Sequence, residues 1–137
     1  MRVKELFVDQ FQIVAVMDGD DCPTENFITE GEESTRAMRE GLLNILMSVA
    51  KGGWENVSSK SHHEANKKNK IHELIKGDLR LFYFKGVGNQ IAVCTTGVRK
   101  TGNKADTAAV TQAAKIRFKY FEAIEAKTLQ VVGYETE

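Results

Sequence analysis

Short apolar runs, separated by turn-forming residues, predict most of the strands in this chain. Phe7-Val8 and the run at 11–17 are expected to form a first strand or strand pair, which ends at the Asp-Gly-Asp-Asp stretch of residues 18–21. Three more strands are expected at residues 71–75, 79–84 and 90–96. The segments that join these three are short and contain glycine, so the strands should be antiparallel neighbours in a meander.

Helical spacing of apolar residues appears in the stretch before these strands. A helix capped by Ser34 or Thr35 is expected to end at Gly52-Gly53. Its apolar residues recur at intervals of three and four, as one face of a helix requires: Met38, Leu42, Ile45, Leu46 and Val49. Pro23, the single proline, fits the first turn of a shorter helix that ends by residue 31.

The remaining segments are a long helix, a polar stretch and a short tail. A helix is expected over residues 105–126, with four residues facing the sheet: Val110, Ala114, Phe118 and Phe121. The polar residues 55–70 are interpreted as a solvated loop or a frayed helix, and residues 129–132 as a final strand or a docked tail.

This order of elements predicts a single α+β domain over residues 1–137, with helices packed on an antiparallel sheet. The expected sequence is a strand, two helices, a three-stranded meander and a C-terminal helix. No apolar run approaches the roughly 20 residues that cross a bilayer, and the N-terminus lacks the apolar core of a signal peptide. Cys22 and Cys94 fit thiols in a reducing compartment better than a disulfide framework, so a cytoplasmic location is expected.

The charges are unevenly distributed although the chain has no net charge. Residues 1–57 carry a net charge of −6, residues 58–119 a net of +9, and residues 120–137 a net of −3. The basic middle stretch favours an anionic partner for one face of the domain. The alternative is that acidic and basic segments fold together and cancel.

Common catalytic motifs are missing from the sequence. It has no P-loop, no nucleophile elbow and no dinucleotide fingerprint, and the glycines at 86–88 are explained by a hairpin turn. His62, His63 and Glu64 are residue types that bind metals. However, adjacent residues point in different directions and no Cys or Asp completes a site, so a solvated loop is the favoured interpretation. Neither a metal nor a cofactor is expected.

Basic residues gather around the last two meander strands. Arg80 is the second residue of its strand. Because side chains alternate along a strand, it shares one face with the aromatic residues Phe82 and Phe84. Lys76 precedes it in the turn, and Arg99, Lys100 and Lys104 follow the next strand. Hairpin geometry predicts that these groups meet along one edge of the sheet, where they could bind a phosphate backbone. Surface cations without such a role remain the alternative.

Three short segments stand in order along the chain: an acidic turn with Cys-Pro at 21–27 (DCPTENF), the strand at 79–84 (LRLFYF), and residues 97–101 (GVRKT) before the last helix. Together they resemble the HigB-like, phage-derived branch of the RelE/ParE toxin superfamily, over residues 11–125. The resemblance implies a RelE-like curved antiparallel sheet with two helices on one side. It also implies a toxin of a type II toxin–antitoxin pair.

Many members of this superfamily cleave mRNA, often at the ribosome, and thereby inhibit translation. In-line attack by a ribose 2′-hydroxyl needs a base, an acid and a cation to stabilise the phosphorane, but no metal. The resemblance implies that Arg80 and Lys100, with Lys76, act as catalytic cations, and that Tyr83 and His72 are candidates for proton transfer. For Tyr83, a buried core residue is the favoured alternative.

The implied RNA-binding residues lie in the loop after the last strand and in the polar stretch: Arg99, Thr101, Lys104, Lys67, Lys68 and Lys70. The implied partners are mRNA, the ribosome and a cognate antitoxin of the helix-turn-helix kind, with no membrane. A metal-free endoribonuclease is therefore the expected activity.

One position departs from the family pattern. Members commonly carry an arginine directly after the Glu-Leu pair of the strand before Arg80. Here Ile75 takes that place, and only Lys76 is available as a substitute. Two further functions therefore remain open: a ParE-like gyrase inhibitor that cuts no RNA, and a phage accessory protein that retains the fold without either activity.

Overall fold

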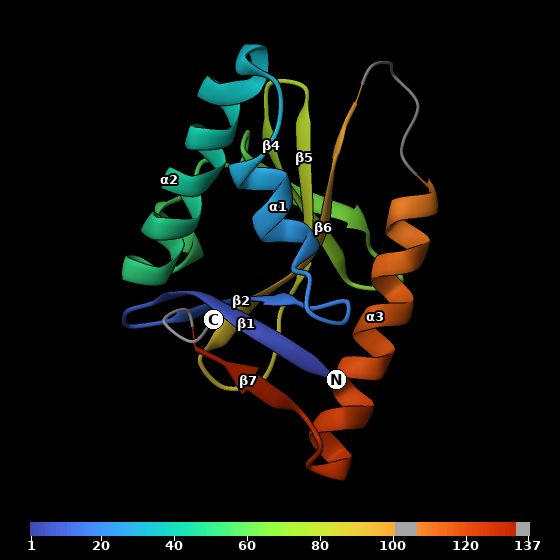
Figure 1. The fold of residues 1–137 in the computed structure, drawn as a ribbon. Helices are drawn as coiled ribbons and strands as arrows, with labels where there is room; N and C mark the ends of the chain where they lie inside the picture. The colour runs from blue at the N-terminus through green and yellow to red at the C-terminus, as the bar shows by residue number, and fades with distance from the viewer. Residues whose placement is uncertain (101–106, 134–137) are drawn as a thin grey trace.

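Seven strands form one mixed sheet in the order β3-β4-β5-β6-β2-β1-β7 (Figure 1). The structure is a computed structural model and describes residues 1–100 and 107–133. The strands are β1 (Arg2–Val8), β2 (Gln12–Val16), β3 (His62–Asn66), β4 (Ile71–Lys76), β5 (Leu79–Phe84), β6 (Gln90–Arg99) and β7 (Gln130–Val132).

The pairing of the strands combines a meander with two parallel contacts. β3, β4, β5 and β6 are antiparallel neighbours, and β1 and β2 form an antiparallel hairpin. However, β2 pairs with β6 in parallel, and β1 pairs with β7 in parallel. The prediction of a purely antiparallel sheet is therefore wrong. The helices and the meander between β2 and β6 form a long crossover, and such a connection permits parallel pairing.

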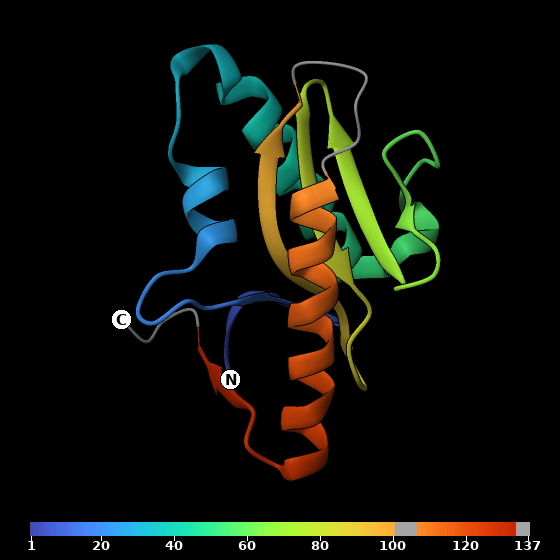
Figure 2. The same ribbon diagram turned by 90° about the vertical axis from the view of Figure 1, so that its right-hand side faces the viewer.

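Helices cover both faces of this sheet. α1 (Pro23–Thr29) and α2 (Arg36–Gly52) pack on one face, and α3 (Thr107–Ala126) runs along the other (Figures 1 and 2). Short 3₁₀ turns at Glu33–Thr35 and Trp54–Asn56 flank α2. The faces follow the two-residue period of β5: Leu81 and Tyr83 belong to the core under α1 and α2, whereas Phe82 and Phe84 belong to the core under α3. The predicted α+β class is confirmed.

Small residues let α3 lie close to the sheet. Its buried residues are Ala109, Ala113, Tyr120 and Ala123, with Val110, Ala114 and Phe121 packed beside them. Phe118, which was expected to face the sheet, is 67% exposed. It lies two residues before the buried Tyr120, which is about 200° around the helix, so it points to solvent.

The polar stretch before β4 contains a strand, so its interpretation as a loop or frayed helix is wrong. β3 pairs with β4 through His62 opposite Leu74 and His63 opposite Glu73. β3 is an edge strand of the sheet, and the edge strands of natural proteins are commonly short and rich in charged side chains. The meander therefore has four strands. The strands expected at β4, β5 and β6 are confirmed. Of the two expectations for residues 129–132, a final strand or a docked tail, the structure has the strand, β7.

Within residues 1–100 and 107–133, no helix combines the length and the apolar character that a bilayer span requires.

Candidate nucleic-acid interface

Arg80 is held in place at the start of β5 by the turn that precedes it. Gly77 adopts φ +56, the left-handed conformation that such a tight turn requires. The Arg80 Nη1 atom donates hydrogen bonds to the carbonyl oxygens of Gly77 (2.7 Å) and Leu79 (3.0 Å). Within the described part of the chain, Arg80 forms no ion pair with a carboxylate. Its guanidinium is therefore a cation held by two carbonyl oxygens, with no carboxylate partner among the described residues.

The cross-strand neighbours of Arg80 are apolar. Ile75 on β4 and Val98 on β6 lie directly opposite it, and this row belongs to the face that α3 covers. Lys76 lies on the other face, where its side chain crosses α2: a methyl group on Gly41 would come within 2.5 Å of the Lys76 Cε atom. Lys76 is therefore not brought to Arg80, and the idea that it substitutes for the family arginine at position 75 is corrected.

A histidine and a glutamate share the face of Arg80. His63 Nε2 lies 3.2 Å from Glu73 Oε1, and these residues are direct partners across β3 and β4. Glu73 is also opposite Phe82, which places it diagonally next to Arg80, roughly 7 Å away by the spacing of a sheet. The sequence pattern predicted neither Glu73 as a site residue nor the contact of His63 with it. Only the pairing of β3 with β4 places the two residues on this face.

Tyr83 and His72, the residues considered for proton transfer, lie on the opposite face. The Tyr83 ring stacks on Trp54 (centroids 4.4 Å apart) and on His72 (5.2 Å). Tyr83 is only 1% exposed, and burial raises the pKa of its hydroxyl well above the usual range. Burial lowers the pKa of the His72 imidazole, and the charge of Lys85 lowers it further. Neither residue therefore shares a site with Arg80.

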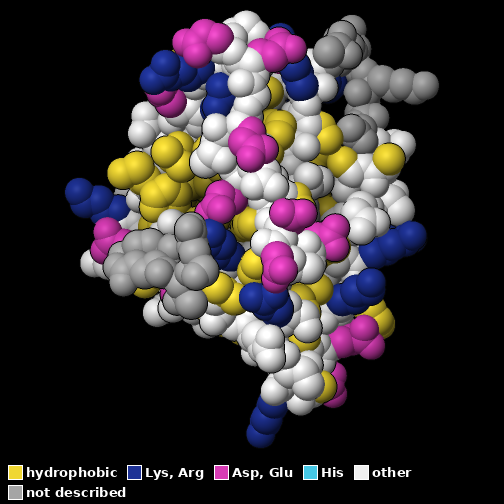
Figure 3. All heavy atoms as spheres, in the orientation of Figure 1, with side chains coloured by type: hydrophobic (Ala, Val, Ile, Leu, Met, Phe, Trp, Pro, Cys, Tyr) yellow, Lys and Arg dark blue, Asp and Glu magenta, His cyan; other side chains and the backbone are white. Residues whose placement is uncertain are grey.

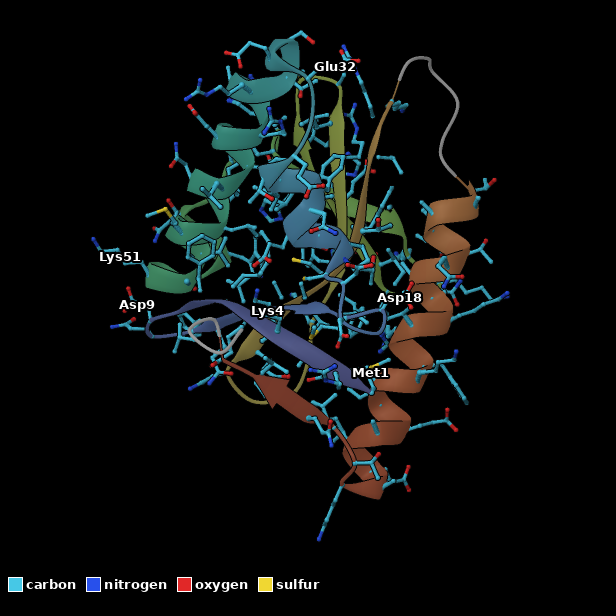
Figure 4. The ribbon with its side chains drawn as sticks, in the orientation of Figure 1. Met1, Lys4, Asp9, Asp18, Glu32 and Lys51 are labelled. Carbon is cyan, nitrogen blue, oxygen red and sulfur yellow. The ribbon has the colours of Figure 1, made fainter. Side chains whose placement is uncertain are left out.

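Arg99 and Lys100 lie at the same end of the sheet as Arg80. The Lys100 backbone N–H donates to the Asp78 carbonyl (2.7 Å). Arg99 points toward the α1 side, with Nη1 3.7 Å from Glu32 Oε2 and Nη2 3.9 Å from Asp78 Oδ2. Figure 4 shows Glu32 at this end of the molecule, beside the turn between β4 and β5. Thr101 and Lys104 lie outside the described residues.

A second group of cations lies at the other end of β5. Lys67, Lys70, His72, Lys85, Arg117 and Glu64 line a hollow of about 370 Å³. The five residue steps from Arg80 to Lys85 correspond to roughly 17 Å of strand. The predicted basic constellation is therefore divided between two ends of the sheet. On the face drawn in Figure 3, Lys and Arg side chains are interspersed with acidic ones and form no single basic patch.

A wider hollow of about 780 Å³ lies between α3 and the N-terminal strands. Its charged side chains are Lys119, Asp18 and Glu122, so its acidic side chains outnumber the basic one. This balance does not favour an anionic ligand. The cations that could bind a phosphate group therefore lie around Arg80 and at the opposite end of β5.

The described residues contain no group of three or more His, Cys, Asp or Glu side chains that could hold a metal. None of the known protein-family models matches this chain, and no curated protein matches it significantly.

Proposed function

We propose that this chain is the cytoplasmic toxin of a type II toxin–antitoxin pair, with the RelE-like arrangement that its motifs resemble. Its proposed activity is the metal-free cleavage of mRNA, at the ribosome, which inhibits translation. The single observation that carries this proposal is the Arg80 guanidinium, which is fixed by two carbonyl oxygens and has no carboxylate partner among the described residues. The helix pair α1 and α2 on one face of the sheet also supports the arrangement.

Three groups on the face of Arg80 can divide the chemistry of RNA cleavage. Arg80 stabilises the negative charge that develops on the phosphorane, because its preformed guanidinium can bind two phosphate oxygens. The Glu73 carboxylate accepts the proton of the attacking 2′-hydroxyl. His63, whose Nε2 atom lies 3.2 Å from Glu73 Oε1, donates a proton to the leaving 5′-oxygen. The products are a 2′,3′-cyclic phosphate and a 5′-hydroxyl.

The test of this proposal is the activity of Arg80→Ala. We expect this variant to lose toxicity and to cleave mRNA a hundredfold or more slowly, the usual scale for the loss of one charge contact to a transition state. Arg80→Lys should recover part of the activity, because an ammonium cannot bind phosphate with two parallel bonds. Growth arrest and mRNA cleavage in a translating extract are the measurements.

The matched control is Arg36→Ala, which removes an arginine that pairs with Glu33 and Glu40 on the surface of α2. It should remain fully toxic. Circular dichroism would establish that both variants are folded. A folded Arg80→Ala protein with full activity would contradict the proposal.

Ile75 favours a second candidate function, that of a toxin that binds its target without cleaving RNA. Its sec-butyl side chain lies directly opposite Arg80, so this pair of positions supplies one guanidinium where the family commonly has two. A ParE-like inhibitor of gyrase needs no phosphorane-stabilising pair. Inhibition of DNA supercoiling by the purified protein, with intact mRNA, would favour this candidate over the ribonuclease.

A further inference from the structure

The hollow at the far end of β5 is built from three separate segments of the chain. Lys67 and Lys70 come from the turn between β3 and β4, Lys85 follows β5, and Arg117 lies on α3. His72 on β4 and Glu64 on β3 complete its lining. We refer to these six residues as the distal hollow. Three segments bring four cations to one volume of about 370 Å³.

The positive charges of the distal hollow outnumber its negative charges among the described residues. Lys67, Lys70, Lys85 and Arg117 form no ion pair with a carboxylate within the described ranges of the chain. Glu64 is the one acidic residue of the lining. A concave site with an excess of one charge concentrates its field and attracts an ion of the opposite sign. The distal hollow therefore favours an anion.

Two of its side chains are held by aromatic contacts. The His72 ring stacks on Tyr83, and Tyr83 stacks in turn on Trp54, which fixes the imidazole to the core. The Arg117 guanidinium carbon lies 4.8 Å from the centre of the Phe121 ring. Side chains that are already ordered lose little entropy when a ligand binds. The hollow is therefore preorganised at two of its residues.

We propose that the distal hollow binds a phosphate group of a single-stranded RNA whose scissile phosphate lies at Arg80. The identity of this ligand rests on the proposed function. Four donors that converge on one volume match a phosphate, which has several oxygens on one atom. An acidic peptide presents its carboxylates one by one along a backbone, and fits such a convergence less well. The RNA would then contact both ends of β5, and the distal phosphate would set its position.

The experiment measures RNA binding rather than cleavage. The variant Lys85→Gln/Arg117→Gln removes two cations of the hollow. The control Lys115→Gln/Lys119→Gln removes two charges from the same helix at exposed positions outside the hollow. The probes are fluorescent 2′-O-methyl RNAs, which cannot be cleaved, of two and of eight nucleotides. Affinity is measured over a series of salt concentrations, with circular dichroism as the folding control.

We expect the first variant to bind the eight-nucleotide RNA roughly tenfold more weakly, because charge-assisted contacts are lost. The slope of log affinity against log salt should fall by about 0.7 for each phosphate contact removed. Binding of the dinucleotide should not change, and the control variant should behave as the wild type. Equal losses in both variants, or no loss in either, would overturn the proposal.

A different outcome also overturns it: unchanged RNA binding by the first variant together with lost binding of a poly-glutamate peptide. That result would make the hollow a protein-binding surface. The proposal of a ribonuclease and the proposal of a distal phosphate site would fail in distinguishable ways. If the wild type cleaves no mRNA but shows the expected dependence on RNA length and on Lys85 and Arg117, the ribonuclease proposal fails and the distal phosphate site stands.

Discussion

Arg80 and Ile75 lie directly opposite each other on β5 and β4, on the face of the sheet that α3 covers. Lys76 is the neighbour of Ile75 in sequence, but it lies on the other face, against α2. The position that commonly holds an arginine in the toxins that the motifs resemble is therefore adjacent to Arg80 in space, and it holds an aliphatic side chain here. This relationship makes position 75 the most direct place to alter the proposed activity.

We expect Ile75→Arg to increase mRNA cleavage by about tenfold or more, because a second guanidinium on the same face can share the phosphorane charge. Ile75 is half-buried at the sheet surface, so an arginine side chain can extend toward solvent. Cleavage rate in a translating extract is the measurement. Lys76→Arg is the matched control. It places a larger cation on the face opposite to Arg80, so it should not increase the rate of cleavage. A gain for Lys76→Arg and none for Ile75→Arg would refute this arrangement.

Glu73→Gln and His63→Gln should each lower cleavage by at least a hundredfold, the lower range for loss of a general base or acid. Their binding of uncleavable RNA should change far less than their rate. Glu55→Gln, at an exposed position beyond α2, is the control and should be neutral. Wild-type rates in both variants would remove Glu73 and His63 from the mechanism.

Cleavage should continue in the presence of a chelator, because the proposed chemistry uses Arg80, Glu73 and His63 in place of a metal ion. Gel analysis of RNA incubated with EDTA is the measurement, and RNA ends with a 2′,3′-cyclic phosphate are the expected products. The comparison must use naked RNA, since ribosomes themselves require magnesium. Loss of cleavage on chelation would show that the mechanism is wrong.

Stability should decrease as the pH is lowered below about 6.5, the ordinary pKa of histidine, and His72 should cause part of this decrease. Burial lowers the pKa of His72 in the folded state. The unfolded chain therefore binds a proton in a pH range where the folded protein does not, and this favours unfolding. Urea denaturation at several pH values is the measurement. His72→Gln should flatten the pH dependence, because it removes the histidine whose pKa burial lowers.

Gly97→Ala should destabilise the fold by about 1–3 kcal/mol, the usual cost of overpacking a core. A methyl group at Gly97 on β6 would collide with the Phe27 ring of α1. Urea denaturation should show a lower midpoint with an unchanged slope. A double-mutant cycle provides the control: in a Phe27→Ala background, the same substitution should cost much less. Equal costs in the two backgrounds would exclude this contact as the cause.

The sequence by itself determined the elements whose residues follow one strong local period. The apolar runs predicted β4, β5 and β6, and the helical spacing predicted α2 and the long C-terminal helix. It also placed Arg80 on the face of two aromatic residues, because side chains in a strand alternate strictly. These properties depend on neighbours in sequence, so they can be read without the fold.

The tertiary structure decided which residues meet. The parallel contact of β2 with β6 and the strand β3 depend on pairing between distant segments, which a local period does not specify. The same pairings put Glu73 and His63 on the face of Arg80, and Lys76, His72 and Tyr83 on the other. They also joined Lys85 and Arg117 to the turn between β3 and β4. A one-residue shift of register moves a side chain to the opposite face of a sheet, so the register of β3 and β4 against β5 decides which of their residues share the face of Arg80.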